Sequence, residues 1–340
     1  MQLIHIIKKQ ETNVIKPGKP MYTAAVAALM AFGMQSAQAM SEAAKNFPDK
    51  PITIVIGYTA GGSTDIPFRV LAENLTGILK QPVIVENKPG AGGVLPAMQL
   101  HNKKPDGYTL AQTPTPVFRL PYISKIDWDP ANDLTYVIGL AGYSFGLVVP
   151  ADSPIKSMKE YIDYAKNNPE KLTYGSPGIM TTLHITMEAI AQDAGVKLVH
   201  VPYKGNAESL KAIIGGFVMS VADTPAWAPY VENGKLRLLS TWGEKRSKKF
   251  PDAPTLKESG IDRVQLSPFG LAVPKKTDPD IVKKLHDALK LAMEKPNFRE
   301  ALEKYDMEPL YMSTEQYTEF AKKTTADEGK VLESLGFQKK

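Results

Sequence analysis

Short apolar runs alternate with longer amphipathic stretches along most of the chain. The β-branched run at 52–56 predicts a buried strand. Apolar residues with helical spacing over 66–78 predict a helix directly after it, with Ser63 or Thr64 as its N-cap. Similar segments are expected further on: strands at 83–85 and 108–111, and a helix opened by the glycine-rich turn at 89–93. This alternation predicts a parallel sheet with helices on both faces.

The same pattern begins again in the middle of the chain. An apolar run at 146–149 predicts a strand, and Ser157-x-x-Glu160 is a capping box that opens a helix. Further on we expect a helix from about 181, strands at 199–201, 217–222 and 236–240, helices at 207–214 and 227–232, a helix capped by Asp278-Pro279, and a last helix opened by the capping box Ser313-x-x-Gln316. Two successive α/β units predict two domains that share a cleft, where the strand ends of such sheets bind ligands.

The N-terminus has the pattern of an export signal. Four lysines between 8 and 19 precede an apolar run over 21–34, and Ala37-Gln38-Ala39 supplies small residues at a cleavage site. The alternative is a short membrane anchor, but the run is shorter than the ~18–20 apolar residues that span a bilayer. We therefore predict a signal peptide over 1–39, cleavage near Ala39 and a periplasmic location, with Met1 or Met21 as the start.

Charge and cysteine content exclude several functions. The segment 1–39 carries a net charge of +3 of the chain's +5, so the remainder carries +2 and its lysines are dispersed. Nucleic acid is therefore not an expected partner. The chain has no cysteine, which excludes disulfides, thiolate nucleophiles and cysteine metal sites.

The loop over 60–65 is the most informative local feature. Its glycines let the backbone approach a ligand closely, and N–H groups at the start of the following helix point toward such a ligand. The site residues that this loop predicts are Ala60, Gly61, Gly62, Ser63, Thr64 and Asp65. A carboxylate or a phosphate would suit it, while a plain strand-to-helix turn explains the same spacing equally well. Other polar groups that could line the cleft are Ser176, Gly178, Thr181, Thr182 and Asp223, the last of which could equally be an N-cap.

Motifs for catalysis and for nucleotides find little support. Gly142-x-Ser144-x-Gly146 fits the spacing of a nucleophile elbow, but an extended run follows it where an elbow needs a helix. Neither glycine-rich loop matches a nucleotide-binding motif. The histidines at 101, 184, 200 and 286 lack metal-ligand spacing, and His200 in its strand is expected to be a core residue. We expect no enzyme activity, no metal and no cofactor.

Several strings together resemble one protein family. They are Lys50-Pro51-Ile52-Thr53 through Gly61-Gly62-Ser63-Thr64-Asp65, Val85 through Gly93, Lys104-Pro105-Asp106-Gly107-Tyr108-Thr109-Leu110, Val201-Pro202-Tyr203-Lys204-Gly205 and Phe250-Pro251-Asp252-Ala253-Pro254-Thr255. In this order they resemble the substrate-binding proteins of the tripartite tricarboxylate transporters, often called the Bug family. The resemblance covers essentially the whole chain after residue 39.

The resemblance implies a two-domain periplasmic-binding-protein fold, or Venus flytrap, with the ligand in the interdomain cleft. Its domains would be 45–145 with 270–340, and 146–269. It implies a monomeric receptor that delivers a small organic carboxylate to a large and a small membrane subunit. The same residues, 60–65 with Thr181, Thr182 and Asp223, would hold the ligand.

Departures from the family pattern suggest which carboxylate is bound. The chain has Ile179-Met180 where the family has an Asn-Gly pair, and Tyr58, Phe145, Met180 and Phe269 could make one wall apolar. This favours an aromatic or longer dicarboxylate such as terephthalate over malate or citrate. The alternatives are a receptor in a carboxylate-sensing system and, less well supported, a serine hydrolase.

Overall fold

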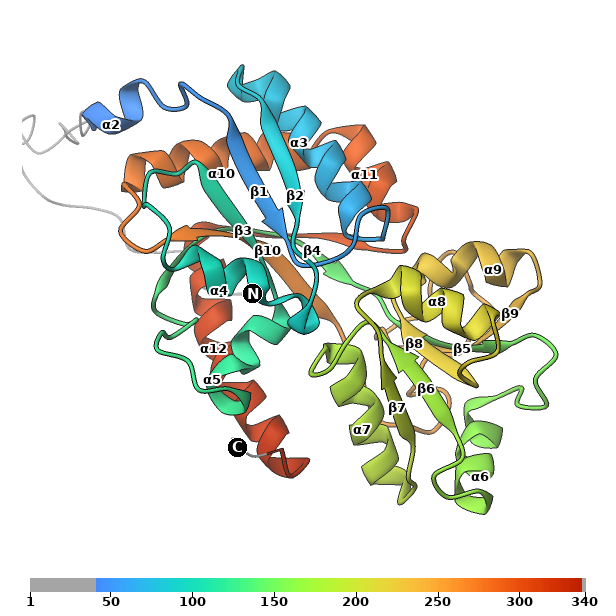
Figure 1. Ribbon diagram of the computed structural model, residues 1–340. Helices are drawn as coiled ribbons and strands as arrows, with labels where there is room; N and C mark the ends of the chain where they lie inside the picture. The colour runs from blue at the N-terminus through green and yellow to red at the C-terminus, as the bar shows by residue number, and fades with distance from the viewer. Residues whose placement is uncertain (1–40, 338–340) are drawn as a thin grey trace, which may run out of the picture. The chain divides into compact units, whose positions relative to one another are not determined.

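The computed structural model describes residues 41–337, whose strands form two separate sheets (Figure 1). The predicted signal peptide at 1–39 lies outside the described residues. The first sheet contains β1 (Ile52–Ile56), β2 (Val83–Asn87), β3 (Thr109–Pro114), β4 (Leu134–Tyr143), β10 (Ser267–Pro274) and β11 (Glu308–Met312). The second contains β5 (Gly146–Pro150), β6 (Thr173–Ser176), β7 (Val199–Pro202), β8 (Ser220–Asp223) and β9 (Leu236–Thr241).

Both sheets are mixed, where the sequence predicted parallel ones. In the first sheet, ordered β11-β4-β10-β3-β1-β2, β1 is parallel to β2 and β3, but β10 is antiparallel to both β3 and β4. In the second, ordered β7-β6-β8-β5-β9, β5 is antiparallel to β8 and β9. The strands that flank the two connections between the sheets are β4 and β5 at one and β9 and β10 at the other, and each of the four takes part in an antiparallel pair.

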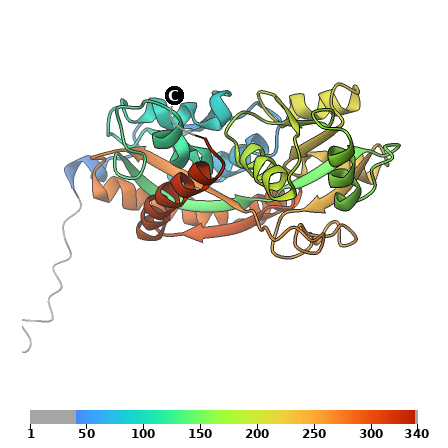
Figure 2. The same cartoon turned by 90° about the horizontal axis from the view of Figure 1, so that it is seen from below.

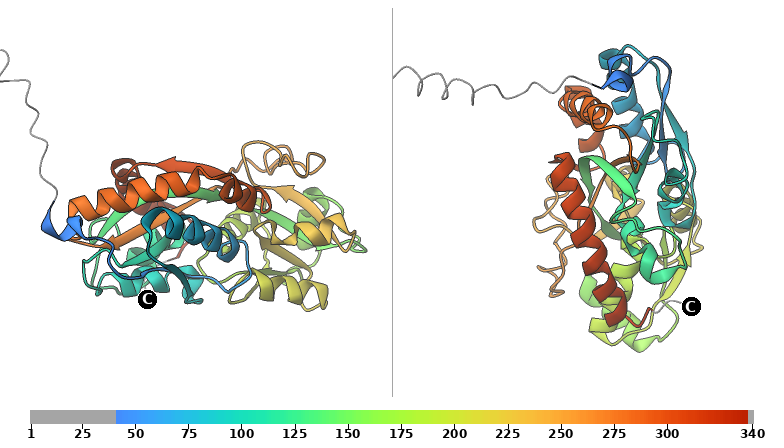
Figure 3. Two further views of the ribbon diagram at one scale, coloured as in Figure 1. Left: turned by 90° about the horizontal axis from the view of Figure 1, so that it is seen from above. Right: turned by 90° about the vertical axis from the view of Figure 1, so that its left-hand side faces the viewer.

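Helices cover both faces of the first sheet, as predicted. The helices that pack on it are α3 (Asp65–Leu79), α4 (Leu95–Leu100), α5 (Leu120–Ile123), α10 (Pro279–Met293), α11 (Pro296–Glu303) and α12 (Thr314–Ser334), with the 3-10 turns η1 (Ala91–Gly93) and η2 (Thr115–Arg119). One core joins the sheet to α3 and α10, which lie side by side in Figure 3, and continues through Phe145 and Trp242 into the second sheet. Another core joins the first sheet to α4, η2 and α12. We call the first sheet with these elements the first lobe.

The second sheet with its helices forms the second lobe. These helices are α6 (Met158–Asn167), α7 (Thr182–Ala194), α8 (Asn206–Ile214) and α9 (Ala228–Glu232), with the 3-10 turn η3 (Pro225–Trp227). The short helix α2 (Glu42–Lys45) precedes both lobes. The exact domain boundaries, 45–145 with 270–340 and 146–269, stay a prediction, because by contacts alone the described residues form one compact unit.

Within residues 41–337 the chain passes between the sheets at two places. These are the turn from Tyr143 to Gly146 and the segment from Thr241 to Ser267. The two segments touch, because Trp242 N–H donates to the Phe145 carbonyl at 3.1 Å and the two rings pack 5.8 Å apart. Any motion of one lobe against the other must therefore bend this pair of strands.

The last helix, α12, lies on the first lobe and reaches the second at its C-terminal end (Figure 2). Its capping box is present as predicted, with Ser313 and Gln316 bonded to each other's backbone N–H. At its other end, Gln192 of α7 donates to the Ser334 carbonyl at 3.0 Å. No helix within 41–337 is long and apolar enough to cross a membrane.

The local predictions succeeded where helical or β-branched patterns were strong. The missed strands are β4, β10 and β11, the missed α-helices are α2, α5 and α11, and the strand predicted at 217–222 is found at Ser220–Asp223. Strand β4 contains Gly139 and Gly142, and β10 contains Pro268, Gly270 and Pro274, and both residue types lower strand propensity. Gly270 allows β10 to lie close to its neighbours. A Cβ at this position would lie 2.0 Å from the Ile138 carbonyl and 2.6 Å from the Tyr317 ring.

Gly270→Ala should therefore destabilise the protein by about 2 kcal/mol or more, as overpacking of a core does. The matched control is Gly77→Ala on α3, where an added Cβ meets nothing within 4 Å. That change should stabilise by roughly 0.5–1 kcal/mol, because alanine favours a helix interior. Urea unfolding measures both, and equal midpoints for the two variants would contradict the packing argument.

Candidate functional site

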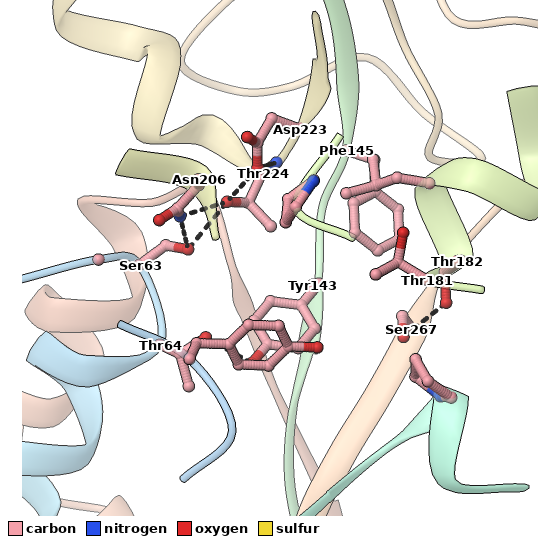
Figure 4. Close-up of a pocket in the computed structure, with 15 residues that line it drawn as sticks. Ser63, Thr64, Tyr143, Phe145, Thr181, Thr182, Asn206, Asp223, Thr224 and Ser267 are labelled. Carbon is pink, nitrogen blue, oxygen red and sulfur yellow. Dashed lines mark hydrogen bonds between the residues drawn. The ribbon is translucent and has the colours of Figure 1, made fainter. Parts of the chain in front are cut away.

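A pocket lies between the two lobes, beside the turn that joins β4 to β5 (Figure 4). Its volume is about 30 Å³, enough for a water molecule or two but too small for an organic acid. A ligand would therefore require the lobes to separate. The lining residues are Tyr58, Gly62, Ser63, Thr64, Pro116, Tyr143, Phe145, Pro177, Thr181, Thr182, Leu183, Asn206, Asp223, Thr224 and Ser267.

One end of the pocket is a cluster of uncharged polar groups that joins the lobes. Ser63 Oγ of the first lobe lies 2.8 Å from Thr224 Oγ1 of the second. Asn206 Nδ2 donates to both, at 2.9 Å and 3.1 Å. Gly62 permits this approach, because a Cβ at that position would lie 2.7 Å from Asn206 Oδ1. The bonds from Ser63 to Thr224 and Asn206 must break if the lobes separate.

Asp223 lies behind this cluster and is fully buried. Its carboxyl accepts hydrogen bonds from Ser209 Oγ and from the N–H of Thr224. Burial nevertheless raises the pKa of Asp223 to about 7, against the hydrogen bonds, which lower it. The charge at this end of the pocket therefore changes close to neutral pH.

The other end is built from the start of α7 and from β10. Thr181 is the N-cap of α7, and its side chain accepts the His184 N–H as it donates to the Gly178 carbonyl. Thr182 Oγ1 lies 3.3 Å from Ser267 Oγ, which belongs to the first lobe. Unlike the end that holds Asp223, this end has no ionisable side chain among its described lining residues, and it too connects the lobes.

Aromatic side chains occupy the middle of the pocket. Tyr143 OH lies 2.7 Å from Thr64 Oγ1 and accepts from Gln112 Nε2, while Tyr58 OH donates to the Gly92 carbonyl at 3.4 Å. Burial raises the pKa of both tyrosines, so both stay neutral. With Phe145 beside them, they separate the two polar ends by an apolar stretch (Figure 4).

Three helices begin at this pocket. Thr64 precedes α3, Thr181 caps α7, and Asn206 is the first residue of α8. The partial positive charges of helix N-termini favour an anion. Ser63 and Thr64 were predicted as N-caps, but neither hydroxyl caps α3, because both are bonded across the pocket instead.

Seven of the predicted site residues line the pocket, and six do not. Those that line it are Tyr58, Gly62, Ser63, Thr64, Thr181, Thr182 and Asp223. Those outside its lining are Ala60, Gly61, Asp65, Ser176, Gly178 and Phe269. Their contacts show what each does instead.

Asp65 holds the glycine-rich loop in shape. Its carboxylate accepts from the Gly61 N–H at 2.8 Å, from Arg69 at 2.9 Å and from Asn87 at 2.8 Å. Burial would raise its pKa, but these donors together hold the pKa of Asp65 below its usual value. Ala60 and Gly61 are exposed, so the start of the loop faces away from the pocket.

The remaining three support the pocket wall from behind. Phe269 is buried against Tyr143, with ring centroids 4.4 Å apart. Ser176 Oγ contacts the Gly178 carbonyl and lies 2.7 Å from His200 Nε2. His200 stacks on His184 at 4.1 Å, and burial lowers the pKa of these histidines to about 4 and about 3. Both are therefore neutral at pH 7.

Sequence reasoning missed Asn206 and Thr224 altogether. Each is adjacent to a motif that was recognised, since Asn206 follows the string ending at Gly205 and Thr224 follows Asp223. Ser267 and Tyr143 come from the unpredicted strands β10 and β4. Tyr143 lies inside the Gly142-x-Ser144-x-Gly146 string, which was considered only for catalysis, and Ser267 lies two residues before the predicted Phe269.

The alternative catalytic site is not supported by geometry. Ser144 lies outside the pocket lining, and its Oγ donates to the Asp306 carbonyl. The strand β5 follows it directly, so the turn is not a nucleophile elbow. Within 41–337 no cluster of three or more histidine, aspartate or glutamate side chains could hold a metal ion.

Comparison with known proteins identifies the family. The profile of the tripartite tricarboxylate transporter family receptor matches residues 67–337. The chain belongs to this family. The resemblance noted in the sequence is therefore confirmed, and it places the chain among receptors of tripartite tricarboxylate transporters.

Relatives of this receptor cover nearly its whole length. A Cupriavidus necator protein, named as a UPF0065 protein in the gbd 5′ region, is 67% identical over 92% of this chain and 95% of its own. The structure of the periplasmic binding protein BugD is 27% identical with a TM-score of 0.82, over 86% of this chain and 100% of BugD. An R. palustris protein solved with adipate is 28% identical with a TM-score of 0.81, over the same shares. The predicted periplasmic-binding-protein fold is confirmed.

Asp223→Asn should change how the receptor's stability depends on pH. The folded protein keeps a proton on Asp223 up to about pH 7, whereas the unfolded chain releases it near the ordinary aspartate pKa of 3.8. This residue's contribution to stability therefore falls as pH rises through that window. His184 and His200 have the opposite effect on stability. In the unfolded chain they bind protons below about pH 6.5, whereas in the folded protein their lowered pKa values keep them neutral down to about pH 4. Removing Asp223 leaves the groups whose contribution to stability rises with pH, which are the two histidines and carboxylates with a lowered pKa such as Asp65.

We therefore expect the stability of Asp223→Asn to rise more steeply from pH 4 to pH 7 than that of the wild type, by a few kcal/mol at about 1.4 kcal/mol per pKa unit. Urea unfolding at intervals of half a pH unit measures both curves. Asp152→Asn, an exposed position of the same lobe, is the control. Parallel curves for Asp223→Asn and wild type would disprove the assignment.

Proposed function

We propose that this receptor is exported to the periplasm, binds a small organic carboxylate in the pocket between its lobes, and delivers it to the large and small membrane subunits of a tripartite transporter. The observation that carries the proposal is the meeting of three helix N-termini at one pocket lined by both lobes. Preorganised N–H groups and hydroxyls in a water-poor cleft favour an anion without a cationic side chain.

The shape of the pocket supports an elongated ligand with two polar ends. The Ser63, Asn206 and Thr224 cluster lies at one end and the Thr182 and Ser267 pair at the other, with aromatic rings between them. A dicarboxylate with an apolar middle would match this order. The related R. palustris protein was solved with adipate, which has this form. An aromatic dicarboxylate such as terephthalate remains our expectation for this chain.

Binding requires the lobes to open and then close on the ligand. The cavity of about 30 Å³ cannot hold a dicarboxylate, so the lobes must separate to admit one and close again less tightly around it. No reaction is needed, and the position of Ser144 gives hydrolysis no support. The receptor would act alone as a monomer, without cofactor or metal.

A thermal-shift screen over mono-, di- and tricarboxylates tests the proposal. A ligand present at 100-fold its dissociation constant should stabilise the receptor by about 2.7 kcal/mol. We expect a dicarboxylate of adipate or terephthalate length to give the largest shift, and its diamide to give none. Shifts from diamides and none from any carboxylate would refute the anion site.

Thr182→Val should reduce the ligand-induced shift, because it removes a hydroxyl at one end of the pocket while keeping the shape of the side chain. We expect the dissociation constant to rise at least about tenfold, as for a lost hydrogen bond to a charged group. Thr186→Val is the matched control, a buried threonine of the same helix outside the pocket lining. Titration calorimetry measures both. An equal loss of affinity in Thr186→Val would contradict the assignment of Thr182 to a ligand-binding end of the pocket.

A further inference from the structure

A buried arginine beside the pocket, Arg119, connects three elements from both lobes. It ends η2 in the first lobe and is 1% exposed. Its Nε and Nη2 donate to the two carboxylate oxygens of Glu328 on α12, at 2.6 Å and 3.0 Å. A two-pronged arginine–carboxylate pair of this kind fixes the plane of the guanidinium group. This pair lies wholly within the first lobe.

The remaining donors of Arg119 reach the second lobe. Nη1 donates to the Met180 carbonyl at 3.0 Å, and Nη2 donates to Thr182 Oγ1 at 3.3 Å. Thr182 lines the pocket, whereas Arg119 does not. Arg119 therefore orients Thr182, which lines the pocket, but Arg119 itself is not part of the lining.

The segment held by Arg119, residues 178–182, is gripped from a second side as well. Its Ile179 carbonyl lies so close to Gly92 of η1 that a Cβ on Gly92 would be 2.8 Å from it. Gly178 also faces Gly92, since a Cβ there would lie 3.4 Å from the Gly92 Cα. Two elements of the first lobe thus enclose one loop of the second.

The C-terminal end of α12 continues this contact along α7. Besides the bond from Gln192 to Ser334, the rings of His184 and Phe337 lie 5.8 Å apart in an edge-on contact. Glu328, which orients Arg119, is on the same helix. The approach of α12 to α7 is visible in Figure 2. Separation of the lobes would break all of these contacts together.

We propose that Arg119 is the latch of the closed receptor: oriented by Glu328, it grips residues 178–182 across the cleft and sets both how far the lobes stay closed and where Thr182 points. In the open form the ion pair with Glu328 persists, while water replaces the bonds to Met180 and Thr182. The proposal rests on the proposed function only in that the lobes separate to admit a ligand.

The test measures the distance between the lobes and needs no ligand. Because the chain contains no cysteine, spin labels can be attached only at introduced sites, Glu73→Cys on α3 and Lys166→Cys on α6, both exposed. Electron–electron double resonance then reports the distribution of distances. If no carboxylate binds, the proposed function fails while this measurement still tests the latch.

The latch is removed by the double substitution Arg119→Met/Glu328→Gln, which leaves no buried charge unpaired. We expect the ratio of open to closed molecules to rise about tenfold or more, since hydrogen bonds from a charged donor are among the stronger ones. The control is Arg237→Met, because Arg237 donates to three backbone carbonyls within the second lobe. Distance distributions that coincide for the double variant and this control would overturn the proposal.

A second variant approaches the same loop without touching the arginine. Gly92→Ala places a methyl group against the Ile179 carbonyl and should also shift the distances toward the open form. Gly234→Ala controls for backbone strain, because its φ of +73° is close to the +68° of Gly92 and nothing lies within 4 Å of its added Cβ. If Gly92→Ala shifts the distances toward the open form and the double variant does not, then contact between residues 178–182 and the first lobe keeps the lobes closed without help from Arg119. That result would also overturn the proposal.

Discussion

The two strand connections between the lobes impose the constraint on which the pocket depends. Within 41–337 the chain crosses from one sheet to the other at Tyr143–Gly146 and at Thr241–Ser267, and the two crossings are bonded to each other through Trp242 and Phe145. These crossings hold the two sheets next to each other. The residues that line the pocket therefore meet at one place although they come from distant parts of the chain.

Polar recognition in the pocket relies on groups that carry no full charge. Hydroxyls and amides at both ends are bonded to one another across the cleft, as Ser63, Thr224 and Asn206 are. A ligand that enters must replace these bonds with its own. A ligand whose polar atoms match both ends therefore binds more tightly than one that matches a single end, since each buried donor left without a partner costs about 1–3 kcal/mol. Selectivity then follows from spacing as well as from charge.

The ionisable groups Asp223 and Arg119 are buried at opposite ends of the pocket. Asp223 is buried in the lining of one end, and Arg119 is buried near the other end, outside the lining, where Glu328 neutralises it. Arg119 therefore acts on the pocket through the residues it holds. The glycine-rich loop follows the same principle, because the Asp65 carboxylate orders its backbone with Arg69 and Asn87 and leaves the hydroxyls of Ser63 and Thr64 free to face the cleft.

The sequence by itself determined the elements whose signal is local. β1 and α3 follow from apolar periodicity, the start of α12 from its capping box, and the glycine loop from its composition, because each depends on neighbours a few residues apart. Only the tertiary structure decided the role of each polar group. Asp65 and Ser63 are two residues apart and looked equivalent in the sequence, yet one braces the loop and the other bonds across the cleft to a residue 161 positions away. Likewise β10 is a strand because its neighbours pair with it and cover it, since Pro268, Gly270 and Pro274 oppose that structure locally. Long-range partners of this kind leave no periodic trace in the chain, and they alone place Tyr143, Asn206 and Arg119 where they act.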